Sequence, residues 1–275
     1  MPDRKRRARR AVPVLAAALA LAAPAHATWS IAAVDPETRE VGVAGASCIL
    51  GAEVLARLVP GAAAVAAQAI PNVAVRDEIA RRAAAGEDPG ALLGDVTGLG
   101  HDRVLGFPLA ALRQYGVASL GDPEHAANFT GRWTVGWAGG RTGPGVAVQG
   151  NMLRGAEVVE QALHAFEQKT PGCRRSLADR LMDALEAGAR AGGDRRCSPE
   201  LAALSAFVVV SDPDDPPGRP SLHLVRSRPG QLPTPWADLW RSFLIGEVKG
   251  TADQNPVLLL RQDYEATRSG GARCH

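Results

Sequence analysis

The 275-residue sequence has few aromatic side chains and few lysines. Aromatic residues make up 4% of the chain, so alanine, glycine and valine must fill most of its core. Lysine occurs three times, and arginine therefore carries nearly all of the positive charge. The uncharged apolar run at residues 11–23 is shorter than the roughly 18 residues that a membrane-spanning helix needs. We therefore expect a core of small, closely packed residues and no stable membrane span.

Several catalytic and cofactor-binding motifs are missing from the sequence. The G-x-S-x-G motif of α/β-hydrolases is absent, because Gly45, Ala46 and Ser47 are followed by Cys48 and Ile49. Neither H-E-x-x-H nor C-x-x-C occurs, which argues against a zinc site. A Walker loop and a Rossmann glycine pattern are also lacking. We therefore expect neither a metal nor a cofactor.

The first 27 residues have the pattern of a signal peptide. A basic start is followed by the apolar run at 11–23 and by Ala25-His26-Ala27, a small-x-small cleavage pattern. The domain organisation that we expect is a signal peptide at 1–27, one folded domain at 28–250 and a C-terminal tail at 251–275. The mature protein would be exported to a periplasmic or extracellular location.

Cleavage would change the charge of the chain. Residues 1–27 hold six basic side chains and one acidic side chain, so their removal takes the formal net charge from +2 to −3. The remaining chain has no basic excess that would attract nucleic acid. We therefore expect a small-molecule partner rather than a nucleic acid. The sequence does not determine the oligomeric state, and a homo-oligomer is compatible with it.

Cleavage after Ala27 would also make Thr28 the first residue. Its hydroxyl and a free α-amino group would then lie on the same residue, as a nucleophile with its own base. An α-amino group with a pKa of about 7.7–8.0 can accept the hydroxyl proton near neutral pH. The sequence therefore predicts Thr28 as a catalytic residue, the alternative being that it is only the residue left by signal cleavage.

Four cysteines are present: Cys48, Cys173, Cys197 and Cys274. In an exported chain they could form two disulfides. The helix expected between Cys173 and Cys197 is roughly 25 Å long, whereas bridged Cα atoms lie within about 7 Å. This favours a pair between Cys48 and Cys197, and buried free thiols are the alternative.

The hydrophobic pattern predicts strands and helices in clusters. Strands are expected at 28–34, 41–46, 61–69, 112–120, 126–130, 146–149, 204–210 and 222–225, and helices at 74–85, 89–93, 156–168, 177–191 and 235–244. Residues 136–145 are expected to be a glycine-rich loop. The first hairpin is apolar at nearly every position, so we expect both of its faces to be covered. This order indicates an α+β layered fold.

Several segments of the chain resemble one known family. They are 28–38, the strand 41–47, Val148-Gln149-Gly150-Asn151, and 185–188 with 192–196. In this order they resemble the DUF1028 proteins, a family of unknown function with an N-terminal-nucleophile (Ntn) hydrolase-like fold. The resemblance implies a four-layer αββα sandwich of two antiparallel sheets. Cys48 and Cys197 depart from the commoner pattern and are shared with a subset of the family, which is compatible with a disulfide between them.

Four residues are candidates for the catalytic machinery. Besides Thr28, Ser47 ends the second strand of the first hairpin and should lie beside Thr28. Asn151 could donate a hydrogen bond to an oxyanion. Asp194 follows a helix end and could orient the amino group. The alternatives are a strand-end serine, a turn asparagine and a structural ion pair.

Four more residues are candidates for substrate binding. Gln149 precedes Gly150 and Asn151 at a strand end, and Arg195 could clamp a carboxylate. Gln68 and Asn72 flank Pro71 and are amide side chains of the same type. The functional hypothesis is an exported amidohydrolase that acts on a small amide or peptide-like bond, and the alternative is a ligand-binding module without catalysis on the same fold.

Overall fold

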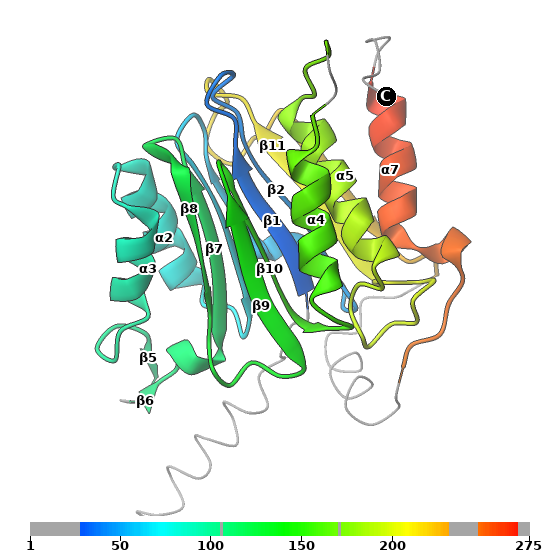
Figure 1. The fold of residues 1–275 in the computed structure, drawn as a ribbon, viewed down its shortest axis with the longest axis horizontal. Helices are drawn as coiled ribbons and strands as arrows, with labels where there is room; N and C mark the ends of the chain where they lie inside the picture. The colour runs from blue at the N-terminus through cyan, green and yellow to red at the C-terminus, as the bar shows by residue number, and fades with distance from the viewer. Residues whose placement is uncertain (1–27, 105–106, 170–171, 231–246, 269–275) are drawn as a thin grey trace, which may run out of the picture.

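The computed structural model describes residues 28–104, 107–169, 172–230 and 247–268. Elements carry the labels of Figure 1. Three of the sequence predictions lie outside the described residues: the signal peptide at 1–27, the helix at 235–244 and any bond of Cys274.

The larger of two antiparallel sheets has the strand order β12-β11-β2-β1-β10-β9. Its strands are β1 (Thr28–Val34), β2 (Val41–Ser47), β9 (Trp137–Gly143), β10 (Val146–Leu153), β11 (Ser205–Ser211) and β12 (Leu222–Ser227). The smaller sheet has the order β3-β4-β7-β8. Its strands are β3 (Ala56–Val59), β4 (Ala63–Ala69), β7 (Arg113–Ser119) and β8 (Asp122–Thr130). The short strands β5 (Arg103–Val104) and β6 (Phe107–Pro108) pair with each other.

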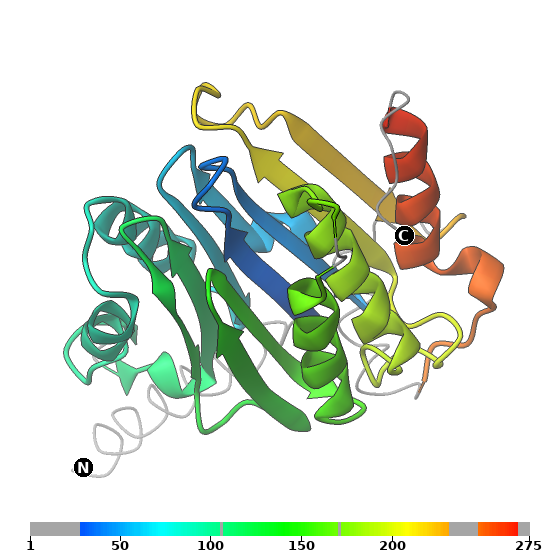
Figure 2. The same cartoon turned by 45° about the horizontal axis from the view of Figure 1, so that its top comes forward.

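The helices form two groups, one for each sheet. Helices α2 (Val73–Ala84) and α3 (Pro89–Val96) pack on the four-stranded sheet. Helices α4 (Glu157–Glu167), α5 (Leu177–Arg190) and α7 (Pro256–Thr267) pack on the six-stranded sheet. Figure 1 shows these groups on opposite sides of the molecule, and Figure 2 shows both sheets between them. The structure therefore confirms a mixed α+β fold with two antiparallel sheets, as the sequence predicts.

The side chains of β1 show how the layers are filled. Trp29 and Ile31 belong to the cluster under α4 and α5, whereas Ala32 and Val34 belong to a cluster that includes Ala64 of the other sheet. Alternate residues of a strand point to opposite faces, so β1 is covered on both sides. All seven of its residues are buried. The prediction of a doubly covered central hairpin is confirmed.

The prediction of a loop at 136–145 is wrong, because Trp137–Gly143 forms β9. Glycine-rich sequences usually weaken a strand. Here the absence of a side chain permits close packing, since a Cβ at Gly140 would lie 2.5 Å from Asn128 Oδ1. Strand β9 pairs with β10 along most of its length, and that pairing supplies its backbone hydrogen bonds.

The segment after residue 250 contributes to the core, although the sequence left it as a tail. Helix α7 begins at Pro256 behind the N-cap Asn255, whose side chain accepts from Val257 N. Its buried side chains Val257, Leu260 and Tyr264 join the cluster of the six-stranded sheet. The helix thereby covers β11 and β12 beside α5 (Figure 1).

Candidate functional site

Thr28 is the first residue of β1 and lies between two strands at one end of the six-stranded sheet. Its Cα is paired with Ser47 of β2 on one side and with Asn151 of β10 on the other. All three residues are buried. The hairpin therefore places Ser47 beside Thr28, as the sequence predicts. The third member, Asn151, is brought there by a strand more than a hundred residues further along the chain.

A buried amide network lies under Thr28, between the two sheets. Gln68 of β4 donates from Nε2 to Thr28 O over 3.2 Å and to Gln114 Oε1 over 2.7 Å. Gln114 of β7 also accepts from Asn151 Nδ2 over 3.0 Å. The two sheets are thus joined by side-chain hydrogen bonds directly beside Thr28. Buried amides stabilise a structure only when they are partnered in this way.

Gln114 is the central member of this network, and sequence reasoning missed it. Besides accepting two hydrogen bonds, it donates from Nε2 to Thr130 Oγ1 at 2.9 Å and to Gly150 O at 2.8 Å. A signal was available, since glutamine is seldom buried inside a protein and Gln114 falls within the strand predicted at 112–120. The same signal applies to Gln68.

Ser30 and Gln149 continue the network along β1 and β10. Ser30 Oγ donates to Gln68 Oε1 and accepts from Gln149 Nε2, each at 2.7 Å. Gln149 Oε1 is buried and has no hydrogen-bond partner in the described part of the chain. It faces Gly116 of β7, where a Cβ would lie 1.9 Å from that oxygen. Gln149 therefore lies beside the other candidate residues Gln68 and Asn151, as a member of the network between the two sheets. Gly116 has no side chain, and this leaves the space that the Gln149 amide occupies.

Asp194 lies on the other side of Thr28, beyond Ser47. Its carboxylate accepts from the backbone N–H of Cys48 at 2.8 Å and from Arg196 Nη2 at 2.7 Å. Arg196 Nη2 also lies 3.4 Å from Ser47 Oγ, to which it donates. Asp194 is fully buried and Arg196 nearly so. A chain of contacts therefore runs from Asp194 through Arg196 to Ser47 beside Thr28.

Arg195, the predicted arginine, points elsewhere. Its side chain is exposed and lies near Gly136 in the turn before β9, where a Cβ would be 3.4 Å from Arg195 Nη1. Arg195 and Arg196 lie in a turn that is closed by the hydrogen bond from Cys197 N to Asp194 O, and Arg196 is the one held inward, by Asp194 and Ser47. Because the two arginines are adjacent, the sequence alone does not show which of them points into the site.

A disulfide closes this side of the site. Cys48 follows Ser47, Cys197 follows Arg196, and their sulfur atoms are bonded, with the Cα atoms 5.8 Å apart. The predicted pair between Cys48 and Cys197 is therefore present in the structure. Cys173 is also disulfide-bonded. Disulfides of this kind are compatible with an exported protein.

Asn72 belongs to a separate but neighbouring cluster. Its side chain caps α2 by accepting from Ala74 N and Val75 N, and it donates to Asp102 Oδ1 over 2.9 Å. Asp102 in turn forms a buried ion pair with Arg113, at 2.6 Å. These contacts give Asn72 a structural role, as the N-cap of α2 and as a partner of Asp102. Arg113 precedes Gln114 on β7, so the cluster borders the amide network without joining it.

Backbone strain is concentrated at this end of the sheets. Ala69 and Met152 have φ values of 69° and 50°, in the left-handed region that favours glycine. Ala69 follows Gln68, and Met152 follows Asn151 within an irregularity of β10 between Gly150 and Leu153. Strained residues are often found at functional sites, where the surrounding structure holds them. Their position supports this end as the candidate site.

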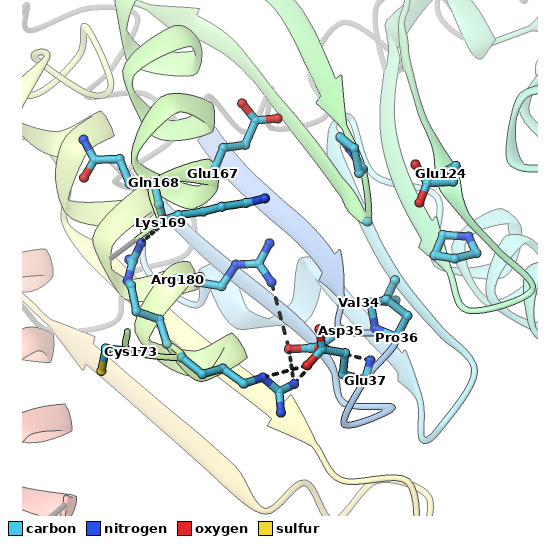
Figure 3. Close-up of a pocket in the computed structure, with 15 residues that line it drawn as sticks. Val34, Asp35, Pro36, Glu37, Glu124, Glu167, Gln168, Lys169, Cys173 and Arg180 are labelled. Carbon is cyan, nitrogen blue, oxygen red and sulfur yellow. Dashed lines mark hydrogen bonds and ion pairs between the residues drawn. The ribbon is translucent and has the colours of Figure 1, made fainter. Parts of the chain in front are cut away.

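A cavity of about 460 Å³ lies at the opposite end of β1. It is lined by Val34, Asp35, Pro36, Glu37, Pro123, Glu124, Pro144, Gly145, Glu167, Gln168, Lys169, Cys173, Arg174, Arg175 and Arg180 (Figure 3). None of the predicted site residues lines it. Strand β1 separates the two regions by roughly 20 Å, at about 3.3 Å per residue.

The described residues contain neither a metal-binding cluster nor a helix that could span a membrane. In 28–104, 107–169, 172–230 and 247–268, no group of three His, Cys, Asp or Glu side chains could hold a metal ion. Within the same ranges, each helix is too short or too polar to cross a membrane.

The chain was compared with known proteins. The model of DUF1028, a family of unknown function, matches residues 28–232. No curated protein matches the chain. Among solved structures, the chain is similar to the protein SPO2555 from Silicibacter pomeroyi, described as a DUF1028 protein. The two are 26% identical, with a TM-score of 0.63 over 89% of this chain and 90% of that one. The family match begins at Thr28 and covers both sheets, and the chain therefore belongs to the DUF1028 family.

Proposed function

We propose that the exported protein is an amidohydrolase of the N-terminal-nucleophile type, with Thr28 as its nucleophile. The observation that carries the proposal is the place of Thr28. It directly follows the signal-cleavage pattern at 25–27, and it is the first residue of a strand in the middle of the six-stranded sheet. The layered fold, with helices on both outer faces, supports an Ntn-hydrolase-like sandwich.

The proposed chemistry begins when signal cleavage turns the Thr28 amide nitrogen into a free amine. That amine accepts the proton from Oγ, directly or through one water, while Oγ attacks the carbonyl carbon of the substrate. The protonated amine then gives its proton to the leaving amine, and an acyl ester on Thr28 remains. Water hydrolyses this ester and restores the hydroxyl.

The neighbours of Thr28 suit this sequence of steps. Asn151 Nδ2 carries two hydrogens, and its hydrogen bond to Gln114 Oε1 uses one of them, so the second can be donated to an oxyanion. Arg196 donates to Ser47 Oγ and thereby fixes the side chain beside Thr28, while Asp194 compensates the charge of Arg196 and holds it in place.

The proposal is tested first by the intact mass and N-terminal sequence of the exported protein, which should begin at Thr28. The mature protein is then incubated with an activated ester and with a panel of small amides and dipeptides. We expect a mass adduct on Thr28 and slow turnover. Thr28→Ser should keep the adduct, and Thr28→Ala should lose both activities.

Thr38→Ala is the matched control, because Thr38 is exposed in the turn after β1, at the far end of the strand. It should behave as the unmodified protein does. A mature protein that begins at Thr28 but is neither acylated nor active on the panel would contradict the proposal. It would leave the ligand-binding module as the function to be tested.

A further inference from the structure

The cavity at the far end of β1 contains a partly buried arginine that is only weakly neutralised. Arg180 of α5 is fixed by Phe166, since its guanidinium lies 4.0 Å from the centre of the Phe166 ring and Nε donates to Phe166 O at 3.3 Å. Its nearest carboxylate oxygen, Asp35 Oδ2, is 4.0 Å from Nη1. The two terminal nitrogens therefore face the cavity, and their N–H groups can donate to a ligand.

Asp35 is already engaged by other groups and cannot fully compensate Arg180. Its Oδ1 accepts from the backbone N–H of Glu37 at 2.9 Å, and its two oxygens accept from Arg174 Nη2 at 3.2 and 3.1 Å. Burial lowers the pKa of the Arg180 guanidinium, and the Asp35 charge opposes that effect. The local balance thus favours a further anion beside Arg180.

The other two arginines beside the cavity, Arg174 and Arg175, are held by other residues. Arg174 pairs with Asp35 and Glu37. Arg175 donates to Gln168 O at 2.8 Å and to Ala165 O at 3.3 Å, and it also pairs with Asp183. These bonds hold the segment that follows α4 against α5. Of the three arginines, Arg180 has the longest ion pair, and its terminal nitrogens are therefore the best placed to bind a ligand.

Further charged side chains of both signs surround Arg180. Lys169, Glu167 and Glu124 line the cavity, and none of them forms an ion pair within the described ranges, although the charge of Glu167 acts on Arg180 from a distance. Figure 3 shows Lys169 and Arg180 extending toward the space below Glu167, with Glu124 on the opposite side. A ligand that carries one charge of each sign would match this arrangement.

The remaining wall is apolar. Val34, Pro36, Pro123 and Pro144 line the side that is formed by the ends of β1 and β8 and by the turn before β10. Such a wall favours a hydrocarbon side chain over a fully polar ligand. The carboxylates nearby disfavour a multiply charged anion such as phosphate.

We propose that this cavity binds a small zwitterion, an amino acid or dipeptide with an apolar side chain. Its carboxylate would lie on Arg180 and Lys169, and its ammonium group on Glu124 and Glu167. A planar guanidinium accommodates both oxygens of a carboxylate, which fits Arg180 for this role. The site is independent of Thr28, and Thr28→Ala protein should bind the same ligand equally well.

The test is isothermal titration calorimetry of the mature protein with L-leucine and L-alanyl-L-leucine. At least one should bind with a dissociation constant of millimolar or below. N-acetyl and C-terminal amide forms of the same compounds each lack one charge and should bind at least tenfold more weakly. Arg180→Gln should weaken binding about tenfold or more, as expected for the loss of charge-assisted hydrogen bonds.

Glu124→Gln and Glu167→Gln keep the test informative if Arg180→Gln does not fold, because both side chains lie at the surface. Either change should weaken the free-amine ligands and leave the N-acetyl forms unaffected. Glu265→Gln and Lys249→Gln, exposed and outside the cavity lining, should change nothing. The proposal is overturned if neither zwitterion binds, if the blocked forms bind equally well, or if inorganic phosphate binds more tightly than both.

Discussion

At the scale of single residues, the candidate site is held by polar side chains that the protein has buried. Thr28 itself is buried between Ser47 and Asn151, and Gln68 and Gln114 connect it to the second sheet. Burying each amide costs free energy of desolvation, and only the hydrogen bonds that the amide forms offset this cost. The site should therefore be sensitive to changes that leave one of these groups without a partner.

Gln114→Ala is expected to destabilise the protein by about 3 kcal/mol, because the amide nitrogens of Gln68 and Asn151 and the carbonyl of Gly150 would each lose a partner. The free energy of unfolding from urea titration measures the effect. Gln161→Ala, on the exposed side of α4, should stay within about 0.5 kcal/mol of the parent. Equal values for the two variants would contradict the importance of the network.

Asp194→Asn should cost about 3 kcal/mol or more, because it leaves the charge of Arg196 buried without its carboxylate. Asp263→Asn is the matched control, since Asp263 pairs with Arg226 at the surface, and it should cost under about 1 kcal/mol. Chemical denaturation of both variants makes the comparison. A similar small loss in each would show that the Asp194 pair is not a determinant of stability.

At the scale of elements, α5 is positioned by its contact with β1. Gly188 lies in α5 where the helix passes the indole of Trp29, whose Nε1 donates to Leu185 O at 3.3 Å. A Cβ at Gly188 would lie 2.6 Å from that nitrogen. The absence of a side chain therefore sets how closely α5 approaches the strand that begins with Thr28.

Two glycine-to-alanine changes separate packing from helix propensity. Gly188→Ala should lower the free energy of unfolding by about 1–3 kcal/mol through overpacking, even though alanine is the better helix former. Gly94→Ala in α3, where a Cβ would have no neighbour within 4 Å, should raise it by about 0.5–1 kcal/mol. Thermal or urea unfolding measures whether each change lowers or raises the free energy of unfolding. A gain at Gly188 would mean that α5 can shift freely over β1.

At the scale of the whole molecule, α7 completes the helix layer over the six-stranded sheet. Tyr264 of this helix is buried, and its hydroxyl donates to Asp179 Oδ1 of α5 at 3.0 Å. Burial raises the pKa of the Tyr264 phenol to about 12, and the charge of Asp179 adds to this effect. The last helix is thereby linked to α5, far from it in the sequence.

This raised pKa makes stability depend on alkaline pH. The phenol of an unfolded chain ionises near pH 10, whereas the folded one stays neutral to about 12. Its contribution is thus complete below pH 10 and is lost as the pH rises toward 12. We expect the free energy of unfolding to fall over this interval, and less steeply in Tyr264→Phe. The slope should not vanish, because burial also raises the pKa of Tyr115. Identical slopes would contradict the assignment.

The sequence by itself determined the central hairpin. Residues 28–34 and 41–46 are apolar at nearly every position and are separated by a short turn, so they could only pair and be covered on both faces. That local pairing also placed Ser47 opposite Thr28. The helices at 74–85 and 177–191 follow in the same way from spacing and caps, because these signals lie within a few residues of each other.

Only the tertiary structure decided which distant segments meet at Thr28. Asn151 and Gln114 are brought there by strand order and by the register of strands far apart in the chain, and Arg196 by a turn whose first residue, Asp194, bridges to Leu153. Local patterns do not encode these arrangements. Arg195 and Arg196 share one turn, and the contacts with Asp194 and Ser47, which exist only in the folded chain, hold Arg196 rather than Arg195 inward. In the same way, the glycines of β9 became a strand because a neighbouring strand was available to pair with them.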